Sequence, residues 1–453
     1  HLTSLDLHSC NRVPAASLAA LIEGLPRLTK LCLADTQCDS LVLEAIGRSC
    51  RRLCELDVSR CKKVSPASLL SLVYDGKGAI FSCQALRILL LQDVKPKGSP
   101  EQWVQALCFV LLALPCLEQL PNPSLPAALS LLYEGRFTNL GPCFNGFPPL
   151  AEVARARAVN GVQSARSHQP NSAASSPKVH HQMSAVTDGP SLRLRKLEDL
   201  EEDDVALLGS LCPLVEEVAF SLSSRPLGTW SLAQWPHLSQ LTLHCSEKPE
   251  RTLEEFLAAL QVIGNSLRVL SVQNLLWCQD QSLTALLTMC PNLQSFQGYF
   301  VVPRQDLLPN EPELPPWPGV PLPLPRLHTF SLMMEGEGLS QSVFQHKLGG
   351  FLVSILKGSP QLESLSLFGV PSPLDSVFEV VYGSGPPRPL QRLRTVSLCS
   401  SNVTQWGASL IIRSRSDLRA LDLSHCKEVT CRDHHQLQER ARKEKLNLAI
   451  SWV

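Results

Sequence analysis

Histidine and cysteine side chains that could bind a metal ion are concentrated near the end of the chain. His425, Cys426, Cys431, His434 and His435 fall within eleven residues, and thiolate and imidazole groups are the usual ligands of zinc in proteins. Cys426, however, also ends a repeated sequence pattern, and Cys431 follows it without the C-x-x-C spacing of a zinc-binding turn. We therefore expect no metal and no other cofactor at this cluster.

No pattern typical of an enzyme occurs elsewhere in the sequence. The chain has no phosphate-binding glycine loop, no G-x-S-x-G nucleophile turn and no H-E-x-x-H zinc motif. The aspartates Asp6, Asp57 and Asp422 occupy the same position of the repeated pattern, so the repeat explains their recurrence and no catalytic pair is needed. The sequence predicts a protein that is not an enzyme and has no catalytic residues.

The repeated pattern is L-x-x-L-x-L-x-x-C, the signature of leucine-rich repeats. It is clearest in the stretches Leu2–Cys10, Leu53–Cys61 and Leu418–Cys426. Less regular copies begin at Leu28, Leu86, Leu117, Val215, Leu238, Leu267, Leu293, Leu327, Leu362 and Leu393. Apart from one gap after Leu117, the copies begin roughly 23 to 35 residues apart, which is enough for one strand, one helix and two turns.

Each repeat is expected to pair a short strand with a covering helix. Alternate side chains of a strand point to opposite sides, so the leucines lie on one side and the intervening residues on the other. In residues 64–73 the covering helix has a capping residue in Ser65 and a suitable first residue in Pro66. Stacked repeats form an α/β leucine-rich-repeat solenoid, with a curved parallel sheet on the concave side and helices on the convex side.

The strength of the pattern divides the chain into five segments. Residues 1–120 carry N-terminal leucine-rich repeats, with helices expected over Ala15–Glu23 and Leu41–Arg48. Residues 121–190 form an irregular or disordered insertion, because prolines interrupt its first part and its second part has few large apolar side chains. The remaining segments are the central leucine-rich repeats at 191–300, a proline-rich loop at 301–326, and the C-terminal leucine-rich repeats with a cap at 327–453.

Two stretches outside the leucine pattern leave alternatives open. The acidic stretch Leu197–Gly209 resembles a helix, and its carboxylates form either a solvated surface or a docking site. The stretch Pro312–Pro325 favours polyproline geometry and is either a stiff loop between repeats or a ligand for an SH3 or WW module. In both cases the pattern favours the first alternative.

Composition limits the partners and the compartment. The chain has 41 basic and 41 acidic residues, so no net charge attracts nucleic acid or an anionic membrane, and we expect neither as a partner. No apolar run approaches the roughly 20 residues that cross a bilayer, and Ala106–Leu114 is expected to be a buried repeat helix. The 17 cysteines, several of them at the repeat position, are interpreted as reduced thiols. This favours a cytoplasmic or nuclear location.

Strand residues that point away from the leucines are expected to face the concave side and to contact a protein partner. In the second half of the chain they are mostly Ser, Thr and Gln, including Gln273 and Gln297. The last column of this register places Tyr299, Met333 and Phe368 in three successive repeats. Large side chains among small polar ones are typical of protein interfaces. The alternative is that these three side chains fold over the strand ends into the core.

The cysteine-ended repeats resemble those of the F-box and leucine-rich-repeat protein family. The resemblance depends on Cys61-Lys-Lys-Val-Ser65 and Cys426-Lys-Glu-Val-Thr430, and it is strongest in the first, third and last repeats. Members of that family bind the Skp adaptor of a cullin ubiquitin ligase through an N-terminal F-box, and their repeats hold the protein to be ubiquitinated. The chain has no F-box and opens at His1 within a repeat strand, so we expect further residues upstream.

Two functions follow from these observations. The resemblance implies a substrate-recognition subunit of a cullin-type ubiquitin ligase, with Skp and cullin bound through a missing F-box and the substrate protein on the concave face. The alternative is a non-enzymatic scaffold that joins other proteins and has no role in ubiquitination.

Overall fold

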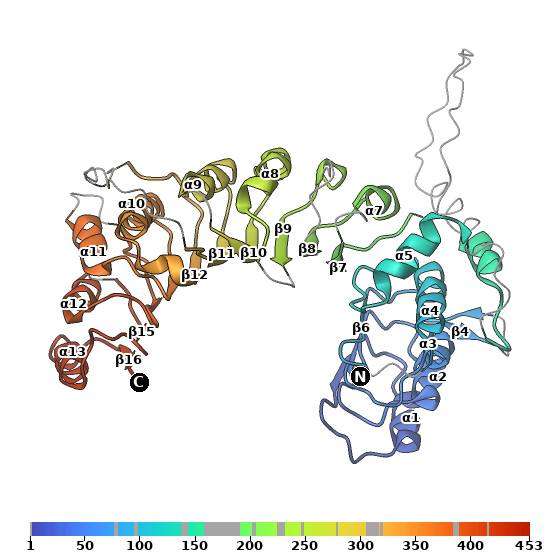
Figure 1. Ribbon diagram of the computed structural model, residues 1–453. Helices are drawn as coiled ribbons and strands as arrows, with labels where there is room; N and C mark the ends of the chain where they lie inside the picture. Colours follow the sequence, from blue (N-terminus) through green and yellow to red (C-terminus); the bar gives the residue numbers. More distant parts are fainter. Residues whose placement is uncertain are drawn as a thin grey trace, which may run out of the picture. The chain divides into compact units, whose positions relative to one another are not determined.

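The computed structural model describes residues 2–76, 80–94, 98–136, 144–157, 191–201, 205–223, 232–245, 249–277, 280–304, 317, 320–383, 389–414 and 416–453. Two compact units are formed, His1–Glu216 and Glu217–Val453. In each unit parallel strands alternate with helices along the sequence (Figure 1). This confirms the expected α/β class and its solenoid-like order.

The first unit contains a parallel sheet whose strands follow one another in the order β1-β2-β3-β6. The strands of this sheet are β1 Ser4–Asp6, β2 Lys30–Cys32, β3 Glu55–Asp57 and β6 Ile88–Leu90. The unit also contains the hairpin strands β4 Tyr74–Asp75 and β5 Ile80–Phe81 and the strand β7 Lys196–Leu200. Its helices are α1 Ala15–Glu23, α2 Ser40–Ser49, α3 Pro66–Val73, α4 Pro100–Ala113, α5 Leu125–Tyr133 and α7 Val205–Leu211. The helices expected in the first two repeats are confirmed by α1 and α2.

The second unit contains a parallel sheet in which sequential strands are neighbours. Its strands are β8 Glu217–Leu222, β9 Gln240–Cys245, β10 Val269–Leu276, β11 Ser295–Val301, β12 Thr329–Glu335, β13 Ser364–Phe368, β14 Thr395–Ser397, β15 Ala420–Asp422 and β16 Ala449–Ser451. Its helices are η3 Leu232–Gln234, η4 Leu253–Phe256, α8 Leu257–Ile263, α9 Asp280–Met289, η5 Glu337–Ser340, α10 Ser342–Gly358, α11 Leu374–Tyr382, α12 Gln405–Arg413 and α13 Cys431–Lys443. Helices α8–α13 lie on one side of this sheet (Figure 1). We call the other side the strand face.

The turn after the strand has the same backbone geometry in six of the repeats. Counting the first leucine of a repeat as position one, the residue at position eight has a left-handed φ of 54° to 60° in Ser9, Asp35, Arg60, Asp93, Ser400 and His425. This conformation costs an L-residue roughly 1 kcal/mol. Aspartate at position five supports the turn, because Asp6, Asp57 and Asp422 each accept the backbone N–H two residues later at 2.8–3.1 Å. The recurrence of these aspartates is therefore structural, as the sequence predicted.

The small residue at position nine joins neighbouring repeats. The thiol of Cys61 donates to the carbonyl oxygen of Leu33 at 3.1 Å, and the thiol of Cys426 donates to that of Leu398 at 3.0 Å. In another repeat the hydroxyl of Ser401 donates to Leu367 at 3.0 Å. In each case the acceptor is at position six of the preceding repeat. Cysteine or serine fits here because the site is buried and needs a short hydrogen-bond donor.

Helix α3 begins as the sequence predicted. The hydroxyl of Ser65 accepts the backbone N–H of Ser68, and the hydroxyl of Ser68 accepts that of Ser65, with Pro66 in the first turn. Such a capping box pairs N–H groups that a helix start would otherwise leave without a partner.

One repeat of the first unit was not recognised in the sequence. The helix expected over Leu197–Gly209 is wrong in its first half, because residues 196–200 form strand β7 and only residues 205–211 form helix α7. Leu197 and Leu200 are both fully buried. This repeat begins at Leu194 and fills part of the gap after Leu117.

The described parts of the segment 121–190 include regular structure. Helix α5 packs on the first unit through Leu125, Leu129 and Leu132. Residues 150–157 are also helical. At their end, the guanidinium of Arg157 donates to the carbonyl oxygen of Leu111 in α4 and, at 2.8 Å, to that of Ser191. The rest of the predicted insertion, residues 137–143 and 158–190, lies outside the described residues.

The described part of the proline-rich loop packs against helix α10. The backbone N–H groups of Leu322 and Leu324 donate to the carbonyl oxygens of Ser354 and Gly358 at 2.9 and 3.0 Å. The ring of Trp317 lies 5.6 Å from that of His346 in the same helix. These contacts fit a loop that belongs to the repeat packing, while most of the stretch for which polyproline geometry was expected lies outside the described residues.

The end of the chain covers the last repeat. Helix α13 is followed by strand β16, which pairs in parallel with β15. The indole N–H of Trp452 donates to the carbonyl oxygen of Val429 at 3.0 Å. The charged helix and the alternating strand that the sequence predicted here are present as α13 and β16.

Candidate functional site

The register predicted for the candidate binding residues is confirmed. Tyr299 in β11 lies opposite Gln273 in β10 and Met333 in β12, and Met333 lies opposite Phe368 in β13. Gln297 lies opposite Ser271 and Ser331. Tyr299, Met333 and Phe368 therefore form one line across three neighbouring strands, which we call the apolar stripe.

The stripe is on the surface of the strand face. Met333 is 37% exposed and Phe368 is 38% exposed, so neither side chain folds over into the core. The residues next to Met333 in the same strand, Leu332 and Met334, are buried on the helix side. The interpretation of the stripe as a set of packed strand ends is therefore wrong for Met333 and Phe368.

Tyr299 is half-buried, and its hydroxyl is held by an acid. The phenol donates to the carboxylate of Glu335 at 2.7 Å, and this hydrogen bond, followed by burial, raises the pKa of Tyr299. Glu335 is exposed and lies two residues beyond Met333 on the same side of β12. Glu335 was not among the predicted binding residues, although its alternate spacing from Met333 places it next to the stripe.

The two candidate glutamines differ in their exposure to solvent. The amide of Gln273 donates to the hydroxyl of Ser271 at 3.0 Å, and Gln273 is half-buried. Strand β10 bulges directly after it, at Asn274, whose amide donates to the carbonyl oxygen of Cys245 at 2.8 Å. Gln297 is exposed, so it is the more accessible of the two for a partner.

The side chains around the stripe are short and polar. Ser331 and Ser366 lie beside the stripe and are half-buried, and the hydroxyl of Thr395 donates to that of Ser364 at 2.9 Å. Strands β9–β14 contain no lysine or arginine, and Glu335 is their only acidic residue. Across β9–β14 the strand face therefore offers large apolar groups, hydroxyls and one carboxylate, groups that a protein partner could contact.

The Cys and His residues near the end of the chain have structural contacts. Cys426 donates to Leu398, and His425 has the left-handed turn geometry. His434 stacks on Trp452, with ring centres 5.7 Å apart, and Cys431 is exposed at the start of α13. Among the described residues, no three His, Cys, Asp or Glu side chains are grouped so that they could hold a metal ion.

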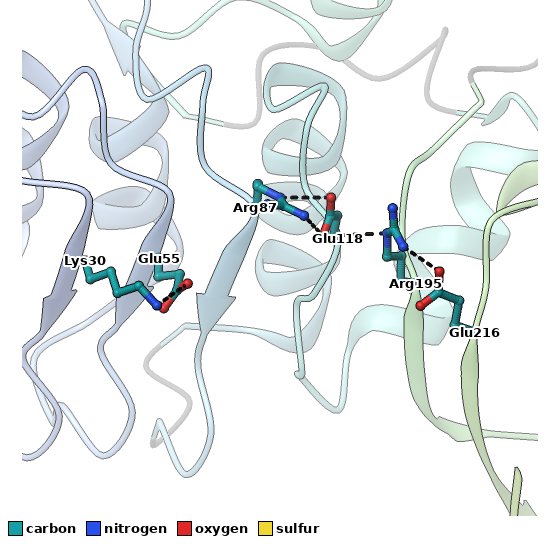
Figure 2. Close-up of polar contacts among 6 residues, drawn as sticks. All are labelled: Lys30, Glu55, Arg87, Glu118, Arg195 and Glu216. Carbon is teal, nitrogen blue, oxygen red and sulfur yellow. Dashed lines mark hydrogen bonds and ion pairs between the residues drawn. The ribbon is translucent and has the colours of Figure 1, made fainter. Parts of the chain in front are cut away.

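A row of alternating charges crosses the first unit and was also missed in the sequence (Figure 2). Arg87 contacts Glu118 at 2.8 Å, Arg195 lies 3.7 Å from the same carboxylate, and Arg195 also pairs with Glu216. The hydrogen bond to Glu118 raises the pKa of Arg87. All four residues, here called the charge ladder, are at position two of their repeats. Aligning this position would have revealed the alternation, but only with the repeat at Leu194 included.

The described cysteines are all free. None of the helices within the described ranges is long and apolar enough to cross a membrane.

Comparisons with known proteins add little to this description. No family model matches the chain, and no curated protein matches it. A solved structure of the Rad7 and Elc1 complex in yeast is similar at 18% sequence identity and a TM-score of 0.34, over 55% of this chain and 67% of that chain. A similarity at this level carries no argument about function or partners.

Proposed function

We propose that this chain is a leucine-rich-repeat scaffold that binds another polypeptide on the strand face of its second unit. The observation that supports this most strongly is the exposure of Met333 and Phe368 on paired strands. The core of the same strands is formed by other side chains, since Leu332, Leu365 and Leu367 are buried. Large apolar side chains exposed together on a polar surface mark sites of protein contact.

The role proposed for this scaffold is substrate recognition in a cullin-type ubiquitin ligase. The support is the resemblance of the cysteine-ended repeats to those of the F-box family, together with the structural use of Cys61 and Cys426 between repeats. Skp and cullin would bind through a part of the gene product that lies outside these repeats. The alternative is a scaffold that binds proteins on the same face without a role in ubiquitination.

The binding proposal is tested by recovery of partners with the full gene product from its own cells. The variant Met333→Ala/Phe368→Ala is compared with Val262→Ala/Val380→Ala, which removes two exposed apolar side chains from helices of the same unit. We expect the first variant to weaken binding of the partner roughly 100-fold, as the loss of two central contacts usually does, and the second to bind normally. If both variants recover the same polypeptides in equal amounts while circular dichroism shows intact folding, the proposal is wrong.

The ligase role is tested in the same material. We expect Skp and cullin subunits to be recovered together with the polypeptide that depends on the stripe, and this polypeptide to accumulate when the proteasome is inhibited. Recovery of the polypeptide without Skp or cullin would instead support the scaffold alternative.

A further inference from the structure

We propose that the partner segment on the strand face is an amphipathic α-helix with a lysine or arginine beside its apolar side. This inference rests on the proposed function and specifies the chemistry of the partner. It follows from the spacing of the apolar stripe and from the charge of the surface around it.

The spacing of the stripe matches the rise of a helix. Neighbouring strands lie about 4.8 Å apart, and Tyr299, Met333 and Phe368 occupy three of them in register. A helix laid across the strands presents one apolar side chain per turn of about 5.4 Å, at i, i+3 or i+4, and i+7. Three successive turns therefore meet three successive strands with a mismatch of about 0.6 Å at each step.

Other backbone conformations fit the same three positions less well. Side chains on one face of an extended strand are about 6.6 Å apart, and equivalent positions of a polyproline helix are about 9 Å apart. Each would move out of register with the stripe by the third contact. The helix is therefore the segment that can place an apolar side chain against Tyr299, Met333 and Phe368 together.

The surface beside the stripe has room for the flanks of such a helix. Gln297, Ser331 and Ser366 lie in the adjacent column of the strand face, and two of the three are serines. The large side chains of Met333 and Phe368 stand next to these short ones, so a rounded element can rest against the stripe while its polar side contacts the hydroxyls.

The charge of this surface favours a basic partner. Strands β9–β14 carry no lysine or arginine. Glu335 is exposed beside the stripe, and within the described part of the chain Tyr299 is the only side chain that donates to its carboxylate. No ion pair of Glu335 occurs among the described residues. Because the phenol holds the carboxylate in place next to Met333, a cation on the flank of the partner helix would find an ordered acceptor.

The inference is tested by selecting peptides that bind the purified chain. A displayed library of random 16-residue peptides is the probe, and recovered sequences are compared with helical and alternating apolar patterns. The best peptide is then measured by fluorescence anisotropy against Met333→Ser, Glu335→Gln, Glu335→Lys and Val262→Ser. Circular dichroism of each variant checks folding.

We expect apolar residues at i, i+3 or i+4, and i+7, with lysine or arginine beside them. Binding should weaken at least tenfold with Met333→Ser and about fivefold with Glu335→Gln, and should not change with Val262→Ser. The Glu335→Lys variant should bind the basic peptide more weakly still. It should bind more tightly a peptide in which the cation is replaced by glutamate.

Two results would overturn the inference in different ways. Selected peptides whose binding depends on Met333 but that are extended, or acidic, would contradict the basic helix and leave the proposed function standing. A selection in which no peptide depends on the stripe would contradict both.

Discussion

The backbone N–H of Arg195 donates to the carbonyl oxygen of Glu118 at 2.8 Å, and the guanidinium of Arg195 lies 3.7 Å from the Glu118 carboxylate (Figure 2). The repeats that begin at Leu117 and Leu194 are therefore direct neighbours, although the segment 121–190 separates them in sequence. Arg157 and Ser191 contact each other beside this junction. The first unit thus keeps its repeat stacking across the insertion.

The charge ladder should contribute a stability that depends on salt. Replacing Glu118 by Gln removes the carboxylate shared by Arg87 and Arg195 and leaves two guanidinium groups close together. We expect a slightly lower Tm at low salt and almost no difference at high salt, because salt screens exposed charges. Glu55→Gln, which affects only the single contact with Lys30, should change Tm less. A loss of Tm that is the same at both salt concentrations would contradict an electrostatic role.

A hydrogen-bond donor at position nine should stabilise the fold whether the donor is a thiol or a hydroxyl. Cys61→Ala removes the hydrogen bond to Leu33 and leaves a small cavity, which should lower the free energy of unfolding by about 1–2 kcal/mol. Cys61→Ser should lower it less, because Ser401 makes the same contact in another repeat. Urea unfolding measures both values, and Cys431→Ala, at an exposed position, is the control. A serine variant less stable than the alanine variant would argue against the hydrogen bond.

Buried thiols should make the fold less stable at alkaline pH. Burial raises the pKa of Cys83, Cys212 and Cys290 to about 12 from the ordinary 9.0. These groups keep their protons in the folded chain and lose them in the unfolded chain, so their contribution is complete below pH 9 and is lost as the pH rises towards 12. Each thiol should lower the free energy of unfolding by about 1.4 kcal/mol per pH unit in that window. Urea unfolding at pH 8 and pH 10 tests this, and Cys212→Ala should show a smaller decrease.

The packing of Trp317, in the proline-rich loop, should depend on the absence of a side chain at Gly349 of helix α10. A Cβ atom at Gly349 would lie 2.5 Å from Cζ2 of Trp317, so Gly349→Val should push the indole away from the helix. We expect a red shift of tryptophan fluorescence and a lower Tm. The same substitution in a Trp317→Phe background should give no red shift. An unchanged spectrum in the first variant would show that Trp317 does not rest on α10.

Much of this fold could be predicted because the spacing of the leucines indicates both the length of each repeat and the register of its strand. The alternation of the strands was enough to place Tyr299, Met333 and Phe368 in one line, and the pairing of β11, β12 and β13 is the predicted one. The repeat at Leu194 was missed for a physical reason. Asp199 has a φ of 56° and adds one residue to the strand. Leu194, Leu197 and Leu200 therefore have the three-residue spacing of a helix, although Leu197 and Leu200 lie in strand β7 and Leu194 lies just before it.

Whether the side chains of the apolar stripe are exposed or buried could not be predicted from the sequence. Whether a side chain at a strand end turns into the core or remains outside depends on the space that neighbouring repeats leave, and the pattern does not report that space. The hydrogen bond between Tyr299 and Glu335 likewise joins two repeats through side chains. The charge ladder depends in the same way on which repeats are adjacent, so its alternation could not be recognised before the repeat at Leu194 was located.

The central claim is that a polypeptide contacts the strand face of the second unit at the apolar stripe. The most direct measurement is cross-linking in cells with a photoreactive phenylalanine at Phe368, compared with the same residue at the exposed helix position Val262. We predict that light joins a defined polypeptide to position 368, that position 262 does not capture it, and that Met333→Ala reduces the yield. Equal capture at both positions, or none at position 368, would contradict the account.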